Sequence, residues 1–250
     1  AISKTENTDV LNYDLKLELD FENKKFSGTV AIDFLIPSGT KEVTFDCGNL
    51  KIIEITGENV VNYTQQKKKV AIALRNDSIR ENHILITYKG SPSHGLIFDP
   101  KGKDVYTVFS TSQWMVCNDA PNDRAKFKIS LTIPKDKQCV ANGVLSETFD
   151  HGSKMRYCWV QDYESPSYTY GFAVGSFNEF QETYNNVQLN YYATSYAPNE
   201  LEAIFSPTKE IIAFFEKKSG VPYVQSTYSQ VLIGNHYQEM SGFAVLKESY

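Results

Sequence analysis

Hydrophobic and polar residues alternate at the start of the chain in the pattern of a β-strand. Between residues 11 and 21 every second residue is hydrophobic: Leu11, Tyr13, Leu15, Leu17, Leu19 and Phe21. A second alternating run spans residues 26–36 and stops before Pro37. A period of two buries one face of a strand and leaves the other in solvent. We therefore predict a long antiparallel hairpin that buries Leu15, Leu17, Leu19, Val30, Ile32 and Phe34.

Shorter hydrophobic runs continue this pattern as far as residue 193. They occupy residues 43–45, 50–55, 70–74, 84–88, 127–133, 155–160, 168–174 and 187–193. Glycine, asparagine and proline residues lie between many of them, and Lys67-Lys68-Lys69 is expected in a solvated hairpin turn. Many short strands separated by turns are typical of a large antiparallel sandwich. The predicted fold class of residues 1–193 is therefore mainly β.

The spacing of hydrophobic residues becomes helical after residue 193. We predict a helix over much of 201–218, followed by strands at 227–233 and 242–246. Ser206-Pro207 favours a helix start with Ser206 as the cap, and Gly220 favours the helix end. A segment of this length buries little core by itself. Residues 194–250 are therefore expected to be the beginning of a second, α/β domain, truncated at Tyr250.

Composition and charge exclude some classes of function. The net charge of −5 and the lack of clustered basic residues argue against nucleic acid as a partner. No hydrophobic stretch is long enough for a membrane span, and the first residues do not form a signal peptide. The four cysteines fit two disulfides, but buried free thiols in a reducing compartment are favoured for a chain of this size. We expect a cytoplasmic protein, or a secreted or periplasmic one if a signal peptide was removed.

The residues alone predict no catalytic residue and no metal ligand. Catalytic zinc needs three protein ligands, usually including two histidines one helical turn apart. No histidine lies four residues from another: the four are His83, His94, His151 and His236. No nucleophilic serine motif and no phosphate-binding glycine motif occurs either. On these motifs, the chain is a β-rich protein without a visible active site.

Residues 234–248 carry a resemblance to a known family. They resemble the exopeptidase segment of the aminopeptidase N and leukotriene A hydrolase family, the gluzincin metallopeptidases. That segment reads Gly-Ala-Met-Glu-Asn, then two residues, then a strand ending in a basic residue and Glu. Alignment from Gly242 to Glu248 places Glu239 on the family's Glu. His236-Tyr237-Gln238 stands where the family has Gly-Ala-Met, and Met240 stands where it has Asn.

Other stretches resemble the same family in the same order along the chain. They are residues 109–113, 116–121 with 125–127, 166–168 with 174–177, and 221–223. The resemblance implies a large antiparallel saddle-like β-sandwich domain over residues 1–193. It further implies that residues 194–250 are the truncated start of a thermolysin-like α/β catalytic domain. The His-Glu-x-x-His zinc motif of the family is expected beyond Tyr250.

The resemblance also implies functional residues. Glu239 and Gln113 are expected to hold the free α-amine of a peptide substrate, with Tyr237, Gln238 and Met240 lining the site. A partly desolvated ammonium group must be paired with acceptors, so such a site selects peptides with a free N-terminus. The segment's backbone is expected to run beside the peptide like an added strand. Zinc is expected in the full-length parent, whereas this chain should bind none and be inactive without the remainder of its catalytic domain.

Several alternatives stay open at this point. The altered pentapeptide fits a non-catalytic relative that serves as a scaffold or interaction domain. A β-rich adhesin or carbohydrate module explains the sandwich but not the segment after residue 193. Gln113 then becomes a surface amide and Glu239 an exposed strand-edge carboxylate. His236 is expected to be structural because it stands alone, and Asp119 is expected to cap a turn.

Overall fold

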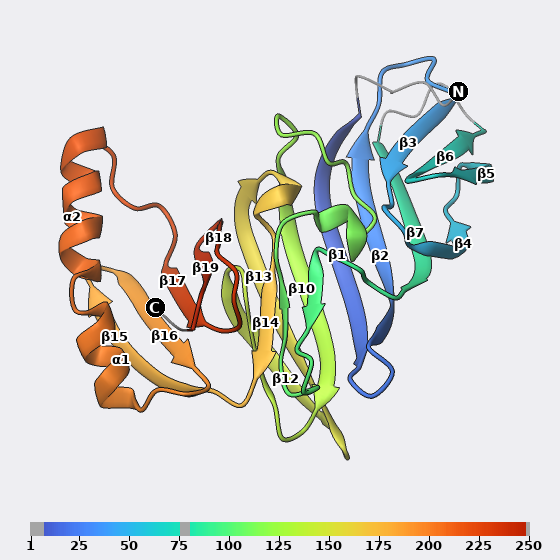
Figure 1. Cartoon of the computed structure of the whole chain (residues 1–250). Coiled ribbons are helices and arrows are strands. Elements are labelled where there is room, and N and C mark those ends of the chain that lie inside the picture. The colour runs from blue at the N-terminus through green and yellow to red at the C-terminus, as the bar shows by residue number, and fades with distance from the viewer. Residues whose placement is uncertain (1–7, 76–80, 249–250) are drawn as a thin grey trace.

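A computed structural model describes residues 8–75 and 81–248 of the chain (Figure 1). The first residues, for which no signal peptide is expected, lie outside this part. The chain is mainly β, as predicted, and the strands of these described residues form four sheets. In Figure 1 a large twisted sheet fills the centre, and a smaller sheet with two helices lies to its left. No helix in the described residues is long and apolar enough to cross a membrane.

The central sheet has seven strands in the order β12-β13-β10-β1-β2-β7-β4. Their bounds are Asp9–Asp20 (β1), Lys25–Leu35 (β2), Lys51–Thr56 (β4), Glu81–Gly90 (β7), Ala125–Pro134 (β10), Val144–His151 (β12) and Lys154–Ser165 (β13). The predicted hairpin is β1–β2, in which Leu15 lies opposite Val30. All six residues predicted to be buried in it are buried: Leu15, Leu17, Leu19, Val30, Ile32 and Phe34.

One pairing in this sheet departs from the antiparallel rule. β1 pairs in parallel with β10, so that Tyr13 lies opposite Phe127. Alternation within each strand predicts which face is buried, but it carries no information about the direction of a partner that lies more than a hundred residues away. The first strand of the chain therefore lies inside the sheet, between β2 and β10.

Two small sheets cover the inner face of the central sheet and complete the sandwich. One contains β3 (Glu42–Asp46), β6 (Lys69–Leu74) and β5 (Val60–Gln66); the other contains β11 (Gln138–Ala141), β14 (Phe172–Gly175), β9 (Val105–Thr107) and β8 (Leu96–Phe98). All three sheets contribute to one hydrophobic core. Phe34 of β2 meets Phe45 of β3 edge to face, with ring centroids 5.5 Å apart. The lysine run forms the predicted β5–β6 turn, with Lys67 in the left-handed conformation.

The remaining strands form a five-stranded sheet in the order β15-β16-β17-β19-β18. Their bounds are Asn178–Tyr184 (β15), Val187–Ala193 (β16), Thr227–Leu232 (β17), Gln238–Met240 (β18) and Phe243–Leu246 (β19). β16 and β17 pair in parallel, so strands on both sides of residue 193 share this sheet. Helix α1 (Pro198–Phe205) covers one face, where Phe205 stacks on Tyr191 at 4.5 Å. The domain boundary at residue 193 stays a prediction.

The helical prediction is confirmed, with one correction. Two helices replace the single predicted one, α1 and α2 (Thr208–Ser219), and α2 ends at Gly220 in the left-handed conformation as expected. Ser206 does not cap α2. Its hydroxyl group donates to the carbonyl of Ala203, and Pro207 occupies the N-cap position without a side-chain hydrogen bond. Ser206 therefore ends the first helix instead of starting the second.

Residues 168–174 are only partly a strand, which is a second correction. The turn η2 occupies Ser167–Thr169, and β14 begins at Phe172. Local hydrophobicity did not reveal this turn, which Thr111 and Asn142 hold through side-chain hydrogen bonds to the carbonyl groups of Ser167 and Thr169. The four cysteines are buried and free, in agreement with the prediction of unpaired thiols.

A carboxyl group ties the start of β1 to the turn that precedes β10. Asp123 accepts the backbone N–H of Val10 at 3.1 Å. Burial raises the pKa of Asp123 from 3.8 to about 6, although hydrogen bonds from Val10 and Asn118 act in the opposite direction. The folded protein therefore holds this proton more tightly than the unfolded chain. The associated stability is fully present below pH 3.8 and is lost as the pH rises through about 6.

We expect Asp123→Asn to be more stable than wild type at pH 7.5 by roughly 1–2 kcal/mol, allowing for solvent screening, and nearly equal to it at pH 4. Asparagine keeps an acceptor oxygen for Val10 but has no titrating proton. Urea unfolding at both pH values measures the difference. Asp162→Asn, which changes an exposed carboxyl group, is the matched control. A variant that gains no stability at pH 7.5 would contradict the assignment.

Candidate functional site

The segment that carries the family resemblance connects β17 to β19 and lies between the two parts of the molecule (Figure 1). Gly234 begins it with a φ of +61°, a conformation that disfavours residues with a Cβ. A Cβ at Gly234 would also lie only 2.2 Å from the hydroxyl oxygen of Tyr106 in β9. Glycine is therefore required here both by the backbone conformation and by the close approach of β9, which belongs to the three sheets formed by β1–β14, called the β domain below.

The alternation of β18 sends its side chains to two different sides. Gln238 and Met240 lie opposite Val245 and Phe243 of β19, and all four are buried. Met240 packs against Gly171, where a Cβ would lie 2.0 Å from the Met240 sulfur. Glu239 lies between them in sequence, so its carboxylate projects from the opposite face of the sheet. The strand therefore docks on the β domain with two side chains and keeps the carboxylate free of that contact.

Polar contacts fasten the same segment to the β domain. The side-chain oxygen of Gln238 accepts the backbone N–H of Phe109, and its NH₂ group donates to the carbonyl of Tyr168 at 3.2 Å. The N–H of Ser241 donates to the carbonyl of Thr169 at 3.1 Å. His236, expected to be structural, lies at the junction with its Nδ1 atom 2.8 Å from the hydroxyl oxygen of Tyr106.

Glu239 is exposed and stands at the β18 edge of the sheet, on the same face that α1 covers over β16. Its cross-strand neighbours on that face are Ala244 and then Gln230. Burial raises the pKa of Tyr228, two residues before Gln230, and the negative charge of Glu239 raises it further. The carboxylate of Glu239 is therefore close enough to Tyr228 for their charges to interact, on the face turned away from the β domain.

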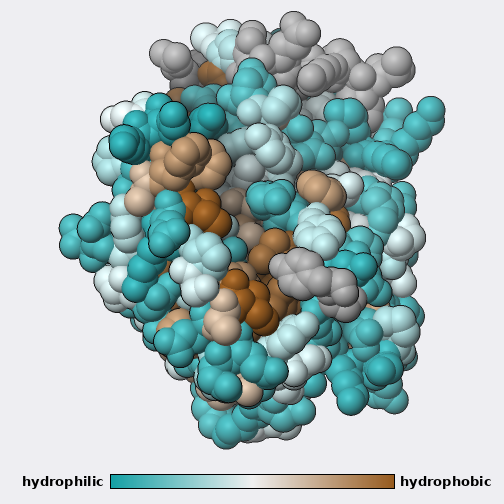
Figure 2. Space-filling model, turned by 60° about the vertical axis from the view of Figure 1, so that its left-hand side comes forward, coloured by the Kyte–Doolittle hydropathy of each residue, from teal (hydrophilic) through white to brown (hydrophobic). Residues whose placement is uncertain are grey.

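A largely apolar pocket of about 560 Å³ opens on this face between α2 and β17. Its lining includes Ile211, Ile212, Phe215, Tyr223, Tyr228 and Gln230. Hydrophobic side chains gather in a hollow on this side of the molecule (Figure 2). Because Tyr228 and Gln230 belong to the sheet face that carries Glu239, the carboxylate and the pocket open to the same side.

Gln113 lies in the β domain, in the short turn η1 (Thr111–Gln113) that follows β9. It is only 6% exposed. Its side chain packs against Gly48 and Gly95, where an added Cβ would come within 2.5 Å and 3.0 Å of Gln113 atoms. The side-chain amide of Gln113 has no hydrogen-bond partner among the described residues. The loop before η1 contacts β18 through a different residue, Phe109, which hydrogen-bonds to Gln238. The structure shows no hydrogen bond between Gln113 and Glu239, and the shared role of the two stays a prediction.

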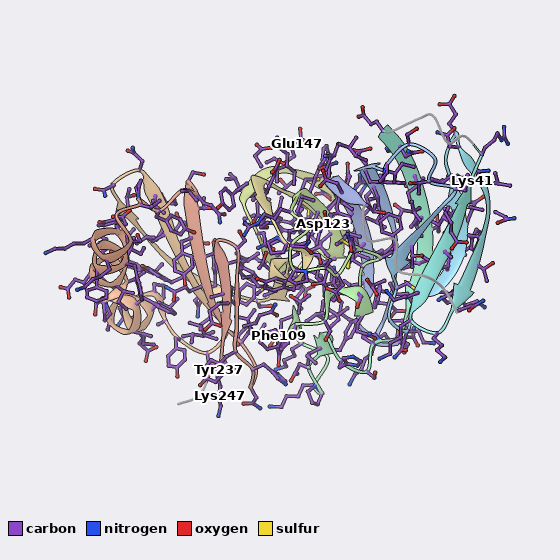
Figure 3. All side chains as sticks on the ribbon, turned by 90° about the horizontal axis from the view of Figure 1, so that it is seen from above. Lys41, Phe109, Asp123, Glu147, Tyr237 and Lys247 are labelled. Atoms are coloured by element: carbon purple, nitrogen blue, oxygen red, sulfur yellow. The ribbon has the colours of Figure 1, made fainter. Side chains whose placement is uncertain are left out.

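The remaining predicted residues fall into different surroundings. Tyr237 is 50% exposed and lies near Phe109 at the junction, far from Lys41 at the other end of the β domain (Figure 3). Gln238 and Met240 are buried in the interface described above. Asp119 does not cap its own turn. Its carboxylate accepts hydrogen bonds from Ser112 at 3.2 Å and Ser167 at 3.4 Å, and thereby links two loops of the β domain.

The described residues do not fit a zinc site. No group of three or more His, Cys, Asp or Glu side chains among them is arranged to hold a metal ion. The histidine nearest the candidate site, His236, is engaged with Tyr106. Any zinc ligands that act with Glu239 must therefore come from outside the residues that the structure describes.

Comparison with known proteins decides the family. Residues 10–169 match the family model described as the peptidase M1 N-terminal domain. The chain belongs to this family. The match covers the strands of the seven-stranded sheet, Phe109, and the η2 turn that contacts β18. The resemblance drawn from the motifs is thereby confirmed.

Individual relatives agree with the family. Aminopeptidase 2 of Candida albicans is 23% identical over 246 residues, covering 91% of this chain and 27% of that protein. Aminopeptidase N of Acetobacter pasteurianus is 22% identical, covering 91% of this chain and 70% of that protein. A crystal structure of the M1 zinc metallopeptidase from Deinococcus radiodurans matches with a TM-score of 0.86 and 18% identity, covering 98% of this chain and 61% of that one. The chain thus spans about a quarter of the Candida relative and shares the fold of the Deinococcus enzyme.

The role of Gln238 could not be read from the motif. The family has Met at this position, so the residue looked like part of a substrate-lining segment. Its actual partners, Phe109 and Tyr168, lie 129 and 70 residues away in sequence. No local signal marks Gln238 as buried, because β18 has only three residues and both sequence neighbours, Tyr237 and Glu239, are exposed.

Proposed function

We propose that this chain provides the β domain and the amine-binding segment of a zinc aminopeptidase that removes N-terminal residues from peptides. One observation carries the proposal. β18 uses Gln238 and Met240 to dock on the β domain and leaves the Glu239 carboxylate exposed on the opposite face, beside an open pocket. A free carboxylate at the position of the family's Glu is the group that an α-ammonium requires.

The chemistry of amine recognition follows from charge. A carboxylate pairs with a protonated amine but gains nothing from an internal peptide N–H at the same place. Glu239 therefore selects free N-termini. In this proposal Gln113 supplies the second acceptor, and the resemblance of residues 109–113 to the family supports that role. The exposed Tyr237 lines the approach to the site.

The partner of this chain is, in the proposal, the remainder of its catalytic domain. The relatives are longer than the chain, as the 27% coverage of the Candida protein and the 61% coverage of the Deinococcus structure indicate. The apolar pocket beside α2 is a surface that such a remainder would cover, and it would carry the zinc ligands. The four free, buried cysteines support a cytoplasmic location for the whole protein.

A second candidate function is a non-catalytic scaffold of the same fold. One observation favours it. Two residues of the altered pentapeptide, Gln238 and Met240, are buried against the β domain and do not face a substrate. The residues encoded after Tyr250 distinguish the two candidates, because an aminopeptidase needs a His-Glu-x-x-His motif there.

Hydrolysis tests the proposal directly. The full-length parent should cleave L-leucine p-nitroanilide and fail to cleave its N-acetylated counterpart, because acetylation removes the charge that Glu239 pairs with. A chelator should abolish cleavage, and zinc should restore it. A parent that carries no zinc and cleaves neither compound supports the scaffold instead.

For the 250-residue chain alone we expect less than stoichiometric zinc after purification, because the described residues provide no set of three ligands. Metal analysis by mass spectrometry measures this, and the full-length parent is the positive control. One tightly bound zinc per chain would contradict the expectation and would require a site that includes residues outside the described part.

A further inference from the structure

Gln238 is buried at the junction and uses both ends of its amide. It is 1% exposed. Its oxygen accepts the N–H of Phe109, and its NH₂ group donates to the carbonyl of Tyr168 at 3.2 Å. These two partners come from separate loops of the β domain, one after β9 and one in η2. A single side chain of β18 therefore connects three segments that are distant in sequence.

The chemistry of the partners fixes the orientation of this amide. A backbone N–H can only donate and a carbonyl oxygen can only accept, so the amide oxygen must face Phe109 and the nitrogen must face Tyr168. Leucine or methionine at this position would offer neither group. Glutamate would keep an acceptor for Phe109 but, when ionised, no donor for Tyr168. Only glutamine satisfies both partners with a side chain of this length.

The turn that Gln238 contacts has an unfavourable backbone conformation. Phe109 and Ser110 both have a φ of +49°, in the left-handed region that residues with a Cβ rarely adopt. Such conformations persist where surrounding contacts hold them. The ring of Phe109 is 55% exposed, so its side chain gives the turn little anchorage. The hydrogen bond from Phe109 to Gln238 is therefore the restraint on Phe109 itself, whereas Val108 and Thr111 on either side of the turn are held by Gly95 and Ser167.

We propose that Gln238 is a positioning residue that clamps β18 to the Phe109–Ser110 turn and thereby fixes the direction of Glu239. β18 has three residues and lies at the edge of its sheet, so its own ladder restrains it weakly. Because side chains alternate, holding Gln238 in the interface holds Glu239 on the opposite face of β18. The role towards substrate rests on the proposed function of Glu239, whereas the clamp itself does not.

Hydrogen exchange in the 250-residue chain tests the clamp. In Gln238→Leu the N–H of Phe109 loses its acceptor, and its exchange should accelerate about tenfold or more. In Gln238→Glu the acceptor remains, and exchange should stay within about threefold of wild type. Gln225→Leu is the matched control, because Gln225 donates to Ser241 of the same hairpin but not to the β domain. Equal acceleration in all three variants, or none in Gln238→Leu, overturns the clamp.

Inhibition of the full-length parent by L-leucine amide tests the role towards the amine. Gln238→Leu should raise its Ki about tenfold, and Gln225→Leu should change it less than about threefold. A purely structural loss lowers the fraction of active protein but leaves Ki unchanged, so the Ki separates the two roles. If Glu239→Ala raises Ki and Gln238→Leu does not, the positioning role is overturned and the proposed function stands. If Glu239→Ala also leaves Ki unchanged, the proposed function fails, and the exchange result still decides the clamp.

Discussion

Under the proposed function, replacing Glu239 with Ala in the full-length parent is expected to lower kcat/KM by tens- to hundreds-fold for substrates with a free N-terminus. The carboxylate is exposed at the β18 edge of the sheet and has no salt bridge with a described residue, so its charge is available to a ligand. Hydrogen bonds to charged groups contribute about 1.5–3 kcal/mol each, and removing one reduces transition-state binding by the corresponding factor. Steady-state kinetics with L-leucine p-nitroanilide measures the loss.

Two further variants give this experiment its controls. Glu239→Gln keeps an oxygen acceptor and loses the charge, so its loss should lie between wild type and Glu239→Ala. Glu202→Ala removes an exposed carboxylate from α1, on the same part of the molecule, and should leave kcat/KM within about twofold. If Glu239→Ala and Glu202→Ala behave alike, the carboxylate is a strand-edge surface group and the amine-anchor assignment is wrong.

The second large effect concerns stability. Phe127→Ala in β10 is expected to reduce the free energy of unfolding by about 3–5 kcal/mol. The ring is buried and stacks on Tyr170 with centroids 4.2 Å apart and planes 5° apart. Tyr170 is held in turn by hydrogen bonds from its hydroxyl group to the carbonyls of Ala125 and Ser165, at 2.9 Å and 2.8 Å. The site therefore relaxes poorly around the cavity. Urea unfolding followed by circular dichroism measures the change.

Phe149→Ala is the matched control for that experiment. Phe149 lies in β12 of the same sheet but is 42% exposed, so it loses far less buried surface. We expect it to cost less than about 1 kcal/mol. A Phe127→Ala variant as stable as Phe149→Ala would mean that β10 does not form the centre of the core.

Local hydrophobic patterns predict the long strands and their buried faces. They do not predict which strands pair when the partners are far apart in sequence. The β1–β2 hairpin follows from alternation and a nearby turn, which lie within one stretch of sequence. The parallel pairing of β1 with β10 depends on where residues 125–134 return in space. β9 and β18 have three residues each, too few for a period to show. Their positions are set by what packs on them, such as Tyr106 against Gly234.

The candidate site divides in the same way. Glu239 stays a prediction, based on a family pattern that the surrounding segment resembles over many residues. Gln113 was chosen by resemblance of a short loop, and the structure places its side chain against Gly48 and Gly95. Phe109, four residues earlier, makes the contact with β18 through its backbone N–H. Every residue except proline has a backbone N–H, so the residue type of Phe109 does not indicate this contact.

The interior position of β1 has a consequence for how the chain folds. β1 pairs on one edge with β2, the next strand in sequence. Its other edge is covered only by β10, which lies more than a hundred residues later. During synthesis that edge presents unpaired N–H and C=O groups next to the alternating hydrophobic residues of the hairpin. Contacts of such large sequence separation slow folding, because the loop between them must be closed before they form. Nascent chains that stop short of residue 125 should therefore be the form most prone to aggregate and to recruit chaperones.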